Sequence, residues 1–330
     1  MVYAVWEKAC NRNGESIMNW ENKKILLIYN PRAGMNARRP KAREILDEMG
    51  ALAAQTDVAA TAYPGHAKEI ATKTGANYDV VICCGGDGTL NEVINGLKEA
   101  GCTPEIGYIP TGSTNDFASN MSIPKKMPQA VAVIKEGNVN ACDCASFNDR
   151  SFTYIASFGP GVAVSYSTPQ GVKNMIGYSA YMINGFGFQT IPTMRALKPK
   201  HIKVEYDGST LEDDFYFGTV SNTLSAAGLF KFSEDEVRFN DGRFEVVLIR
   251  RMKNPMQMFS LLVKMRRHEY DGDMLVHFRA SHLKFTFEKE EVWTLDGESS
   301  GKVKDVEINV KQEAINLLCP DSVYFEKREQ

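Results

Sequence analysis

Continuous apolar runs alternate with helical stripes in the first half of the chain. The runs at 25–29 and 80–84 are continuously apolar, as in strands that are buried on both faces of a sheet. Between them, apolar residues recur at three- and four-residue spacing, as in amphipathic helices. This alternation predicts an open, mostly parallel sheet with helices on both faces. The predicted strands are 25–29, 58–61, 80–84 and 106–109, and the predicted helices are 42–49, 66–73 and 89–97.

The pattern changes after about residue 145. Short runs in which apolar and polar positions alternate predict half-buried strands. Asp207-Gly208 and Asp241-Gly242 have the composition of hairpin turns. The second half therefore predicts a mainly antiparallel β domain, interrupted by helices at about 173–185 and 255–268. The predicted strands are 201–206, 215–220, 244–249 and 283–287.

These patterns divide the 330 residues into four segments. Residues 1–21 form an N-terminal extension, and 22–145 form the α/β domain. Residues 146–312 form the β-rich domain. The last segment, 313–330, contains an apolar stretch at 315–319, and we expect this segment to pack back on the first domain.

Composition narrows the class of protein. The apolar fraction of 43% and the charged fraction of 24% are ordinary for a globular chain. A net charge of −3 argues against a nucleic-acid binder, which usually carries a basic excess. Seven cysteines without zinc-ribbon spacing fit buried thiols in a reducing cytosol. No apolar run approaches the roughly 18 residues of a membrane span, so we expect a cytoplasmic protein whose membrane contact is peripheral.

The segment Gly85-Gly86-Asp87-Gly88-Thr89 lies between a predicted strand and a predicted helix. Its glycines let a phosphate approach backbone N–H groups, and the positive end of the following helix favours the same anion. Asp87 could bind Mg²⁺ or orient the phosphates, as acids do in other phosphoryl-transfer sites. A tight strand-to-helix turn needs fewer glycines than this, so the segment predicts a phosphate-binding loop.

Two further loops of similar composition follow predicted strands. Residues 30–34 (NPRAG) come directly after the first strand, and residues 110–117 (PTGSTNDF) follow the strand at 106–109. Ligands of open α/β sheets collect at the carboxyl ends of the strands. We therefore expect the three loops to converge on one edge of the sheet and to form one phosphate site.

The sequence has neither a GxxxxGK[ST] P-loop nor a GxGxxG fingerprint. Its motifs instead resemble the diacylglycerol kinase catalytic-domain family, most closely its soluble bacterial lipid kinases, from about Lys24 to Pro320. GGDGT alone also occurs in NAD kinases and ATP-dependent phosphofructokinases, so the longer motifs carry the specificity. They are NPRAG at 30–34, Thr61 with PGHA at 64–67, GGDGTLNEVING at 85–96, GSTNDF at 112–117, VSY at 164–166, NDG at 240–242 and DGE at 296–298.

The resemblance implies an ATP-dependent kinase that phosphorylates a membrane lipid hydroxyl, with diacylglycerol to phosphatidic acid as the leading reaction. It implies that the first domain binds the nucleotide and the β-rich domain binds the lipid. ATP and Mg²⁺ are the expected cofactors. The positions that match the family's ATP contacts are Asn30, Pro31, Arg32, Ala33, Gly34, Thr61, Gly86, Asp87, Gly88, Thr89, Leu90, Asn91, Glu92 and Ser113.

The resemblance also implies three catalytic acids. Asp87 and Asp116 match acids that the family requires for activity, through Mg²⁺ and ATP. Glu298 matches the general base, which takes the proton of the lipid hydroxyl as that oxygen attacks the γ-phosphorus. On the residues alone, the Asp296-Gly297-Glu298 segment is equally a plain hairpin turn.

A structural Mg²⁺ in the second domain is implied as well. Asp241 matches the ligand that uses its carboxylate, and Arg238 and Arg243 match the two that use backbone carbonyls. Relatives often have an uncharged residue at the position of Arg243, whose guanidinium must therefore point away from the metal. Without the resemblance, Asp241 in its Asp-Gly pair indicates only a turn.

Other functions stay open on the sequence. NAD kinases share GGDGT and a two-domain plan, and Asn91-Glu92 is the pair that such an enzyme would use at the ribose. A catalytically silent lipid- or nucleotide-binding protein is the alternative outside enzymes, and the three retained acids count against it. Among lipids, phosphatidylglycerol, ceramide and sphingosine compete with diacylglycerol.

Basic residues cluster at 195–203 and at 250–267, where they flank a predicted helix rich in Met and Leu. Such side chains contribute about 1 kcal/mol each near anionic headgroups. We expect transient docking on the inner face of the membrane, and an ordinary solvated surface is the alternative. No nucleic-acid partner is expected, and a homodimer is left open.

Overall fold

The computed structural model describes residues 18–34, 40–50, 53–159, 198–226, 230–232, 237–252, 254–266, 272–322 and 324–325. The chain splits into two compact units. Unit 1 comprises residues 1–141 and 315–322, and unit 2 comprises residues 142–314 and 323–330. Strands β5 (Val139–Phe147) and β15 (Glu298–Leu318) contribute residues to both units.

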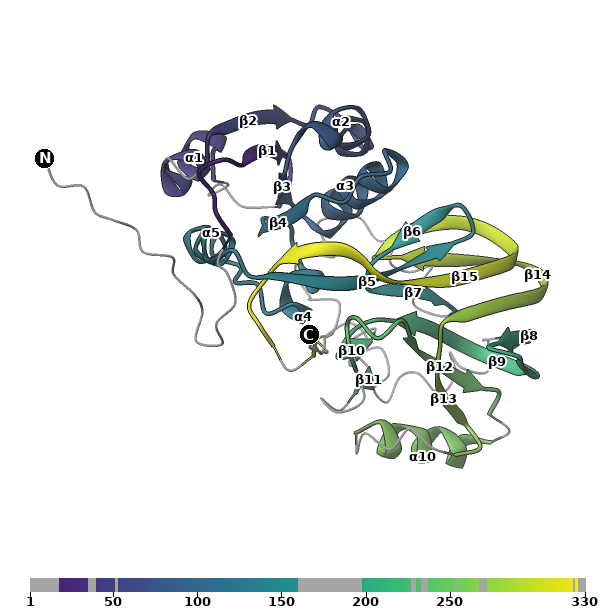
Figure 1. The fold of residues 1–330 in the computed structure, drawn as a ribbon. Helices are drawn as coiled ribbons and strands as arrows, with labels where there is room; N and C mark the ends of the chain where they lie inside the picture. The colour runs from purple at the N-terminus through teal and green to yellow at the C-terminus, as the bar shows by residue number, and fades with distance from the viewer. Residues whose placement is uncertain are drawn as a thin grey trace, which may run out of the picture. The chain divides into compact units, whose positions relative to one another are not determined.

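Unit 1 contains parallel strands in the order β15-β4-β3-β1-β2 (Figure 1). Each neighbouring pair in this order is parallel. The C-terminal part of β15 joins the unit by pairing Asn316–Leu318 with Glu105–Gly107. The strands are β1 (Lys24–Tyr29), β2 (Gln55–Ala60), β3 (Val80–Gly85) and β4 (Glu105–Pro110).

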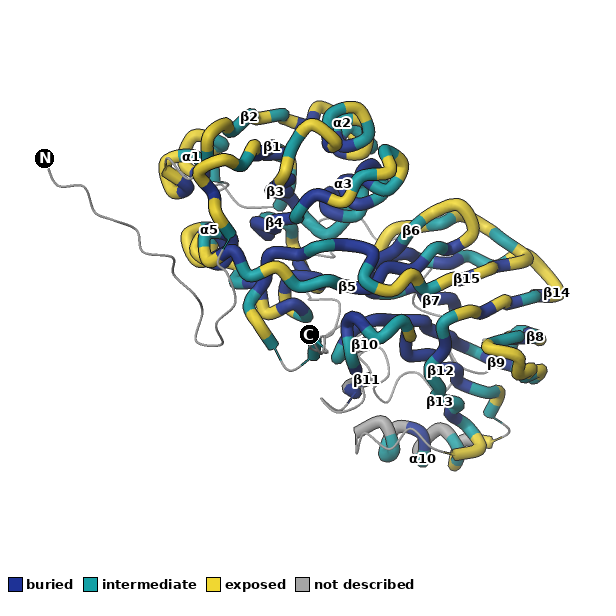
Figure 2. Tube along the Cα trace, in the orientation of Figure 1, coloured by how far each residue is buried: buried dark blue, intermediate teal, exposed yellow. Residues whose placement is uncertain are grey.

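Helices pack in pairs around these strands. Helix α1 packs against α5, and α2 packs against α3; in Figure 1 the two pairs lie on opposite sides of β1 and β3. Strand β3 is buried at every residue, as its unbroken apolar run predicted (Figure 2). The helices are α1 (Ala42–Met49), α2 (His66–Thr74), α3 (Asp87–Glu99), α4 (Asp116–Asn120) and α5 (Met127–Glu136), with a 3₁₀ turn at Gly75–Asn77.

Unit 2 is mainly antiparallel. Its strands follow the order β13-β12-β9-β7-β14-β15, with β8 paired to β9 and β14, and β5 paired to β15 and β6. Helix α10 (Pro255–Arg266) lies between β12 and β13 in the chain. The strands are β6 (Arg150–Phe152), β7 (Ile155–Phe158), β8 (Lys200–Tyr206), β9 (Ser209–Ser221), β12 (Phe244–Arg250), β13 (Leu275–Ala280) and β14 (His282–Leu295), and β10 (Ser225–Ala226) pairs with β11 (Phe230–Lys231).

Trp293 lies at the centre of the unit 2 core. Its ring contacts Phe147, Phe158, Phe285 and Phe287, with ring centroids 4.8 to 6.1 Å apart. Burying such large rings removes much apolar surface from water, and edge contacts between them add further stabilisation. The core therefore joins strands β5, β7 and β14 of the antiparallel half.

The mixed α/β class predicted from the sequence is confirmed. The Asp207-Gly208 hairpin joins β8 to β9, with both residues at positive φ as a type I′ turn requires. The prediction of a hairpin at Asp241-Gly242 is wrong, because β12 pairs with β9 and β13 and not with the strand before it. The predicted helix at 173–185 and the VSY motif at 164–166 lie outside the described residues. Among the helices that the structure describes, none combines the length and hydropathy of a membrane span.

Candidate active site

The three glycine-containing loops of unit 1 meet, as the sequence predicted. A Cβ on Gly34, whose φ is 78°, would lie 2.3 Å from the carbonyl oxygen of Thr111. A Cβ on Gly112 would lie 2.6 Å from the Cα of Gly86. Larger residues cannot occupy these positions unless the loops separate. The glycines therefore permit backbone-to-backbone contact between loops that follow β1, β3 and β4.

Asn30 links the first loop to the second. Its amide Nδ2 donates to Thr89 Oγ1 at 2.9 Å, and its Oδ1 accepts the backbone N–H of Arg32 at 2.9 Å. Both loops are thereby held by one side chain. A phosphate that approaches this edge would meet a surface whose shape is fixed before the ligand binds, which lowers the entropy lost on binding.

Asp87 links the second loop to the third. Its carboxylate accepts the backbone N–H groups of Asp116 at 3.0 Å and Phe117 at 3.3 Å, the first two of α4. The hydroxyls of Thr114 and Tyr108 each lie 3.4 Å from it. Asp87 thus supplies the cap that α4 lacks from its own N-cap residue. The acid predicted to bind Mg²⁺ holds the third loop in place.

Asp116 is the acid that faces solvent in this cluster. Among the described residues, no hydrogen bond or ion pair engages its carboxylate. Desolvation by the surrounding protein raises the pKa of this carboxyl, and the Lys125 ammonium opposes the rise. Lys125 donates to the backbone carbonyl of Thr114 at 2.6 Å, which holds its charge beside the loop. An accessible carboxylate next to a cation suits a magnesium–triphosphate ligand, so the residues present fit that group.

Two predicted nucleotide contacts have structural partners instead. Glu92 accepts the backbone N–H groups of Gly65 at 2.8 Å and Ala67 at 3.2 Å, so its carboxylate holds the start of α2. The Leu90 side chain is 1% exposed and lies in the core. Of these two residues, neither offers its side chain to a ligand in this arrangement. Ser113 and Arg32 are exposed on their loops, and Thr61 is buried directly after β2.

Thiols next to the second loop are not nucleophiles. Cys83 and Cys84 are buried in β3, and burial raises the pKa of Cys84 to about 12. A thiol with such a pKa carries almost no thiolate at neutral pH. The expectation of buried thiols holds for this pair.

In unit 2, Asp296 fixes the turn that carries Glu298. The Asp296 carboxylate accepts four hydrogen bonds, from the backbone and hydroxyl of Thr153 and from the N–H groups of Tyr154 and Ile155, at 2.8 to 3.1 Å. Glu298 follows at the start of β15 and is exposed. Its role as general base stays a prediction, since Glu298 belongs to unit 2 and Asp87 and Asp116 belong to unit 1.

The predicted structural metal site also lies in unit 2. The Asp241 carboxylate contacts the guanidinium of Arg279 and accepts the backbone N–H of Arg243 at 3.0 Å. Arg238 donates its guanidinium to the carbonyl of Val237 at 2.9 Å. Within the described ranges, no cluster of three or more His, Cys, Asp or Glu side chains could hold a metal. The only charged ligand of the predicted set is already ion-paired, so these residues do not fit Mg²⁺ in this arrangement.

Several residues of the predicted basic clusters are ion-paired. Lys200 contacts Glu291, and Lys203 lies 3.1 Å from Glu205. The other pairs are Arg250 with Asp213 at 3.0 Å and Arg251 with Asp214 at 3.3 Å. Neighbouring acids therefore reduce the positive potential of this surface. Arg195, Lys253 and Arg267 lie outside the described residues.

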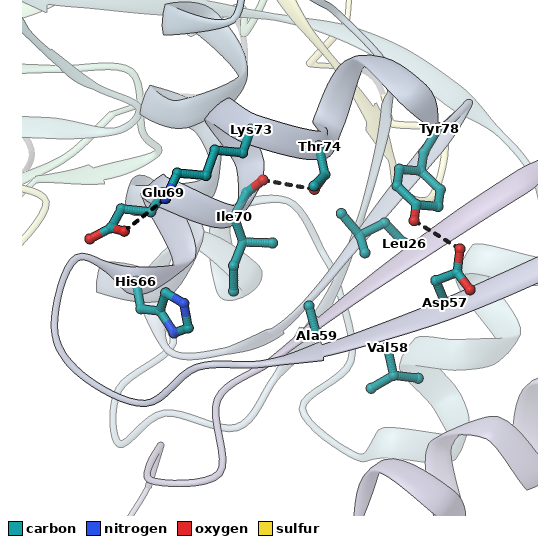
Figure 3. Close-up of a pocket in the computed structure, with 10 residues that line it drawn as sticks. All are labelled: Leu26, Asp57, Val58, Ala59, His66, Glu69, Ile70, Lys73, Thr74 and Tyr78. Atoms are coloured by element: carbon teal, nitrogen blue, oxygen red, sulfur yellow. Dashed lines mark hydrogen bonds and ion pairs between the residues drawn. The ribbon is translucent and has the colours of Figure 1, made fainter.

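A pocket of about 270 Å³ lies between β2 and α2 of unit 1 (Figure 3). Its polar groups satisfy one another: Tyr78 donates to Asp57 at 2.8 Å, and Lys73 pairs with Glu69 at 3.4 Å. None of the predicted nucleotide or catalytic residues lines it. The pocket is therefore separate from the three-loop cluster.

Two residues that the motifs did not predict, Tyr108 and Lys125, also lie at the site. Tyr108 is buried in β4 beside Asp87, and burial together with the Asp87 charge raises the pKa of its phenol well above the usual value. It therefore stays a neutral donor. Lys125 follows the GSTNDF motif in the chain, and no sequence pattern around it predicts a role in the site. For Tyr108, the one available sequence signal was a single tyrosine in the apolar run at 106–109.

The amino-acid sequence is similar to those of known diacylglycerol kinases. A family model described as the diacylglycerol kinase catalytic domain matches residues 24–147. A diacylglycerol kinase of Staphylococcus saprophyticus is 32% identical over 307 residues, covering 92% of this chain and 98% of the relative. A diacylglycerol kinase of Staphylococcus aureus strain Newman is 30% identical over the same length, covering 92% and 95%.

Solved structures show the same fold. A diacylglycerol kinase structure from Bacillus anthracis str. Sterne superposes with a TM-score of 0.68 at 21% identity, covering 91% of this chain and 98% of that one. Another structure from the same organism gives a TM-score of 0.75 at 23% identity, covering 92% and 99%.

Proposed function

Because this chain belongs to the diacylglycerol kinase family, we propose that it transfers the γ-phosphoryl group of ATP to the hydroxyl of diacylglycerol and so produces phosphatidic acid. The observation that carries the proposal is the three-loop cluster, in which Gly34, Gly86 and Gly112 bring three strand ends into backbone contact. Backbone N–H groups at such strand ends, together with the N-terminus of α3, suit a triphosphate.

In unit 1, the loops would orient the phosphates and Asp116 would hold the magnesium that accompanies ATP. Bound Mg²⁺ would neutralise charge on the phosphate oxygens. Lys125 beside Asp116 adds a positive charge to the same region. Asp87 would act indirectly, because its carboxylate holds the backbone of Asp116 in place and does not itself hold the metal. Positioning and charge stabilisation account for most of the acceleration in phosphoryl transfer.

Glu298 is the proposed general base. It takes the proton of the lipid hydroxyl while that oxygen forms a bond to the γ-phosphorus, and the bond to the β,γ-bridging oxygen breaks to release ADP. Asp296 supports this role, since four hydrogen bonds fix the two-residue turn directly before Glu298. A base on a rigid turn keeps its geometry without substrate.

Docking on the membrane surface would be transient. Met256 on α10 is 82% exposed, which offers an apolar contact next to the basic cluster. Arg250 and Arg251 are ion-paired with Asp213 and Asp214, so they would contribute less to electrostatic attraction toward anionic lipids. We expect sedimentation with vesicles to depend only modestly on salt. A steep fall between low and physiological salt would instead assign docking mainly to charge.

The direct test supplies purified protein with radiolabelled ATP and Mg²⁺ and offers diacylglycerol in mixed micelles. Parallel reactions contain phosphatidylglycerol, ceramide, sphingosine or NAD. Label in phosphatidic acid, together with loss of at least about 100-fold in kcat for Glu298→Gln at unchanged KM for ATP, supports the proposal. Ser299→Ala, at the next exposed position, is the matched control. Label in NADP would show that the chain is an NAD kinase, and no label in any product would show a silent binding protein.

A further inference from the structure

A buried charge cluster of unit 2 lies where the family resemblance implies a structural metal. Arg279 is on β13, and β-strand pairing puts it directly opposite Glu245 of β12. The Arg279 guanidinium contacts the Asp241 carboxylate through Nη2, and its Nε lies 3.3 Å from Glu245 Oε1. One guanidinium therefore bridges two carboxylates.

The burial of this cluster explains why it needs a cation. The Glu245 side chain is 0% exposed and that of Asp241 is 12% exposed. An ionised carboxylate removed from water is strongly unfavourable unless a positive charge and hydrogen bonds compensate it. Arg279, 31% exposed, supplies that charge through an ion pair with each of the two carboxylates.

Other side chains fix the turn that a metal would otherwise order. The buried Asp143 of β5 accepts the backbone N–H of Gly242 at 2.6 Å and that of Glu313 at 2.7 Å. Gln312 donates to the carbonyl of Asn240 at 2.9 Å. The conformation of the Asn240–Arg243 turn is thus set from both sides by hydrogen bonds.

A magnesium ion would fit poorly beside this guanidinium. Mg²⁺ requires near-octahedral coordination by oxygen, and it usually keeps several waters. Asp241 is the one charged ligand in the predicted set, and its carboxylate already binds Arg279 and the N–H of Arg243. A divalent ion would have to displace Arg279 and leave Glu245 buried without its cation.

We infer that Arg279 replaces the structural metal, so that unit 2 keeps the Asn240–Arg243 turn folded without a divalent cation. The inference does not depend on the reaction proposed for the protein. It concerns the chain's own charges, and its tests measure metal binding and stability.

The first test titrates Mn²⁺ into the nucleotide-free full chain and follows free Mn²⁺ by electron paramagnetic resonance. We expect Asp241→Asn to bind as much Mn²⁺ as the wild type, because any bound ion would be held by acids elsewhere. Binding of about one Mn²⁺ per chain that disappears in Asp241→Asn would overturn the inference. This measurement requires no variant of Arg279 to fold.

The second test compares thermal unfolding in EDTA and in Mg²⁺. The wild type should unfold at the same temperature in both. Arg279→Ala should unfold at least about 5 °C lower in EDTA, and Mg²⁺ should restore part of the loss, because two carboxylates then lack a cation. Arg238→Ala, which removes a nearby guanidinium that does not bond to Asp241, is the matched control and should show no Mg²⁺ dependence. An EDTA-induced fall in the wild type that Asp241→Asn abolishes would refute the replacement.

Discussion

Replacing Asp87 by asparagine separates an anchoring role from a metal-binding role. The carboxylate accepts two backbone N–H groups of α4 at 3.0 and 3.3 Å. Hydrogen bonds to a charged acceptor contribute roughly 1.5–3 kcal/mol each, and an asparagine keeps one oxygen but turns an NH₂ group toward the other donor. We therefore expect Asp87→Asn to lose about 2–3 kcal/mol of unfolding free energy, which corresponds to a fall of roughly 5–10 °C.

The assay is thermal unfolding without nucleotide or metal, combined with hydrogen exchange of peptides that cover residues 111–120. These peptides should exchange faster in Asp87→Asn, because α4 loses its cap. Asp116→Asn is the matched control. Since the folded state raises the Asp116 pKa, the ionised form is disfavoured on folding at neutral pH, and removing that charge should leave stability unchanged or slightly higher. Asp116→Asn should instead lose the stabilisation that Mg²⁺ and ATP give.

Equal stability and equal exchange in Asp87→Asn and the wild type would refute the anchoring role. If both variants lost only the stabilisation by Mg²⁺ and ATP, Asp87 would be a ligand rather than an anchor.

Three other predictions follow from the same geometry. The acid limb of kcat/KM should lie above pH 3.8, the usual pKa of aspartate, because activity requires ionised Asp116 and desolvation raises the pKa of that carboxyl. Lys125→Ala should move this limb to still higher pH, because the lysine charge opposes the rise. A pH–rate profile that is the same in the wild type and in Lys125→Ala would contradict this prediction. Asp296→Asn should lower kcat more than it raises KM for ATP, because the amide can accept fewer of the four hydrogen bonds that hold the turn before Glu298. Equal effects on kcat and KM in steady-state assays would contradict this prediction. Gly112→Ala should raise KM for ATP at least about tenfold, because the alanine Cβ would lie 2.6 Å from the Cα of Gly86 and would push the two loops apart. An ATP affinity equal to that of the wild type in calorimetry would count against a role for this contact between the loops.

Local sequence patterns predicted much of the fold. The unbroken apolar run at 80–84 indicated a strand buried on both faces, and β3 has that burial along its length. The Gly85–Thr89 segment was predicted to lie between a strand and a helix; β3 ends at Gly85, and α3 begins at Asp87, two residues before the predicted start. These features depend on neighbouring residues and on backbone preferences, so a window of a few residues contains the information.

The partners of the acids could not be predicted in this way. Asp87 bonds to residues 29 and 30 positions away, and Asp296 bonds to Thr153, 143 positions away. An aspartate beside glycine is equally suited to ligate a metal, to cap a helix or to hold a turn. The choice depends on which donors the fold brings to the carboxylate.

The sequence by itself determined the strand and helix pattern, the glycine positions and the family. Tertiary structure decided that Asp87 anchors a loop, that Asp116 keeps an accessible carboxylate and that Arg279 lies beside Asp241. The physical reason is that secondary structure follows from local backbone and burial preferences, whereas the role of a charged group depends on distant charges and donors that only chain folding brings within a few ångströms.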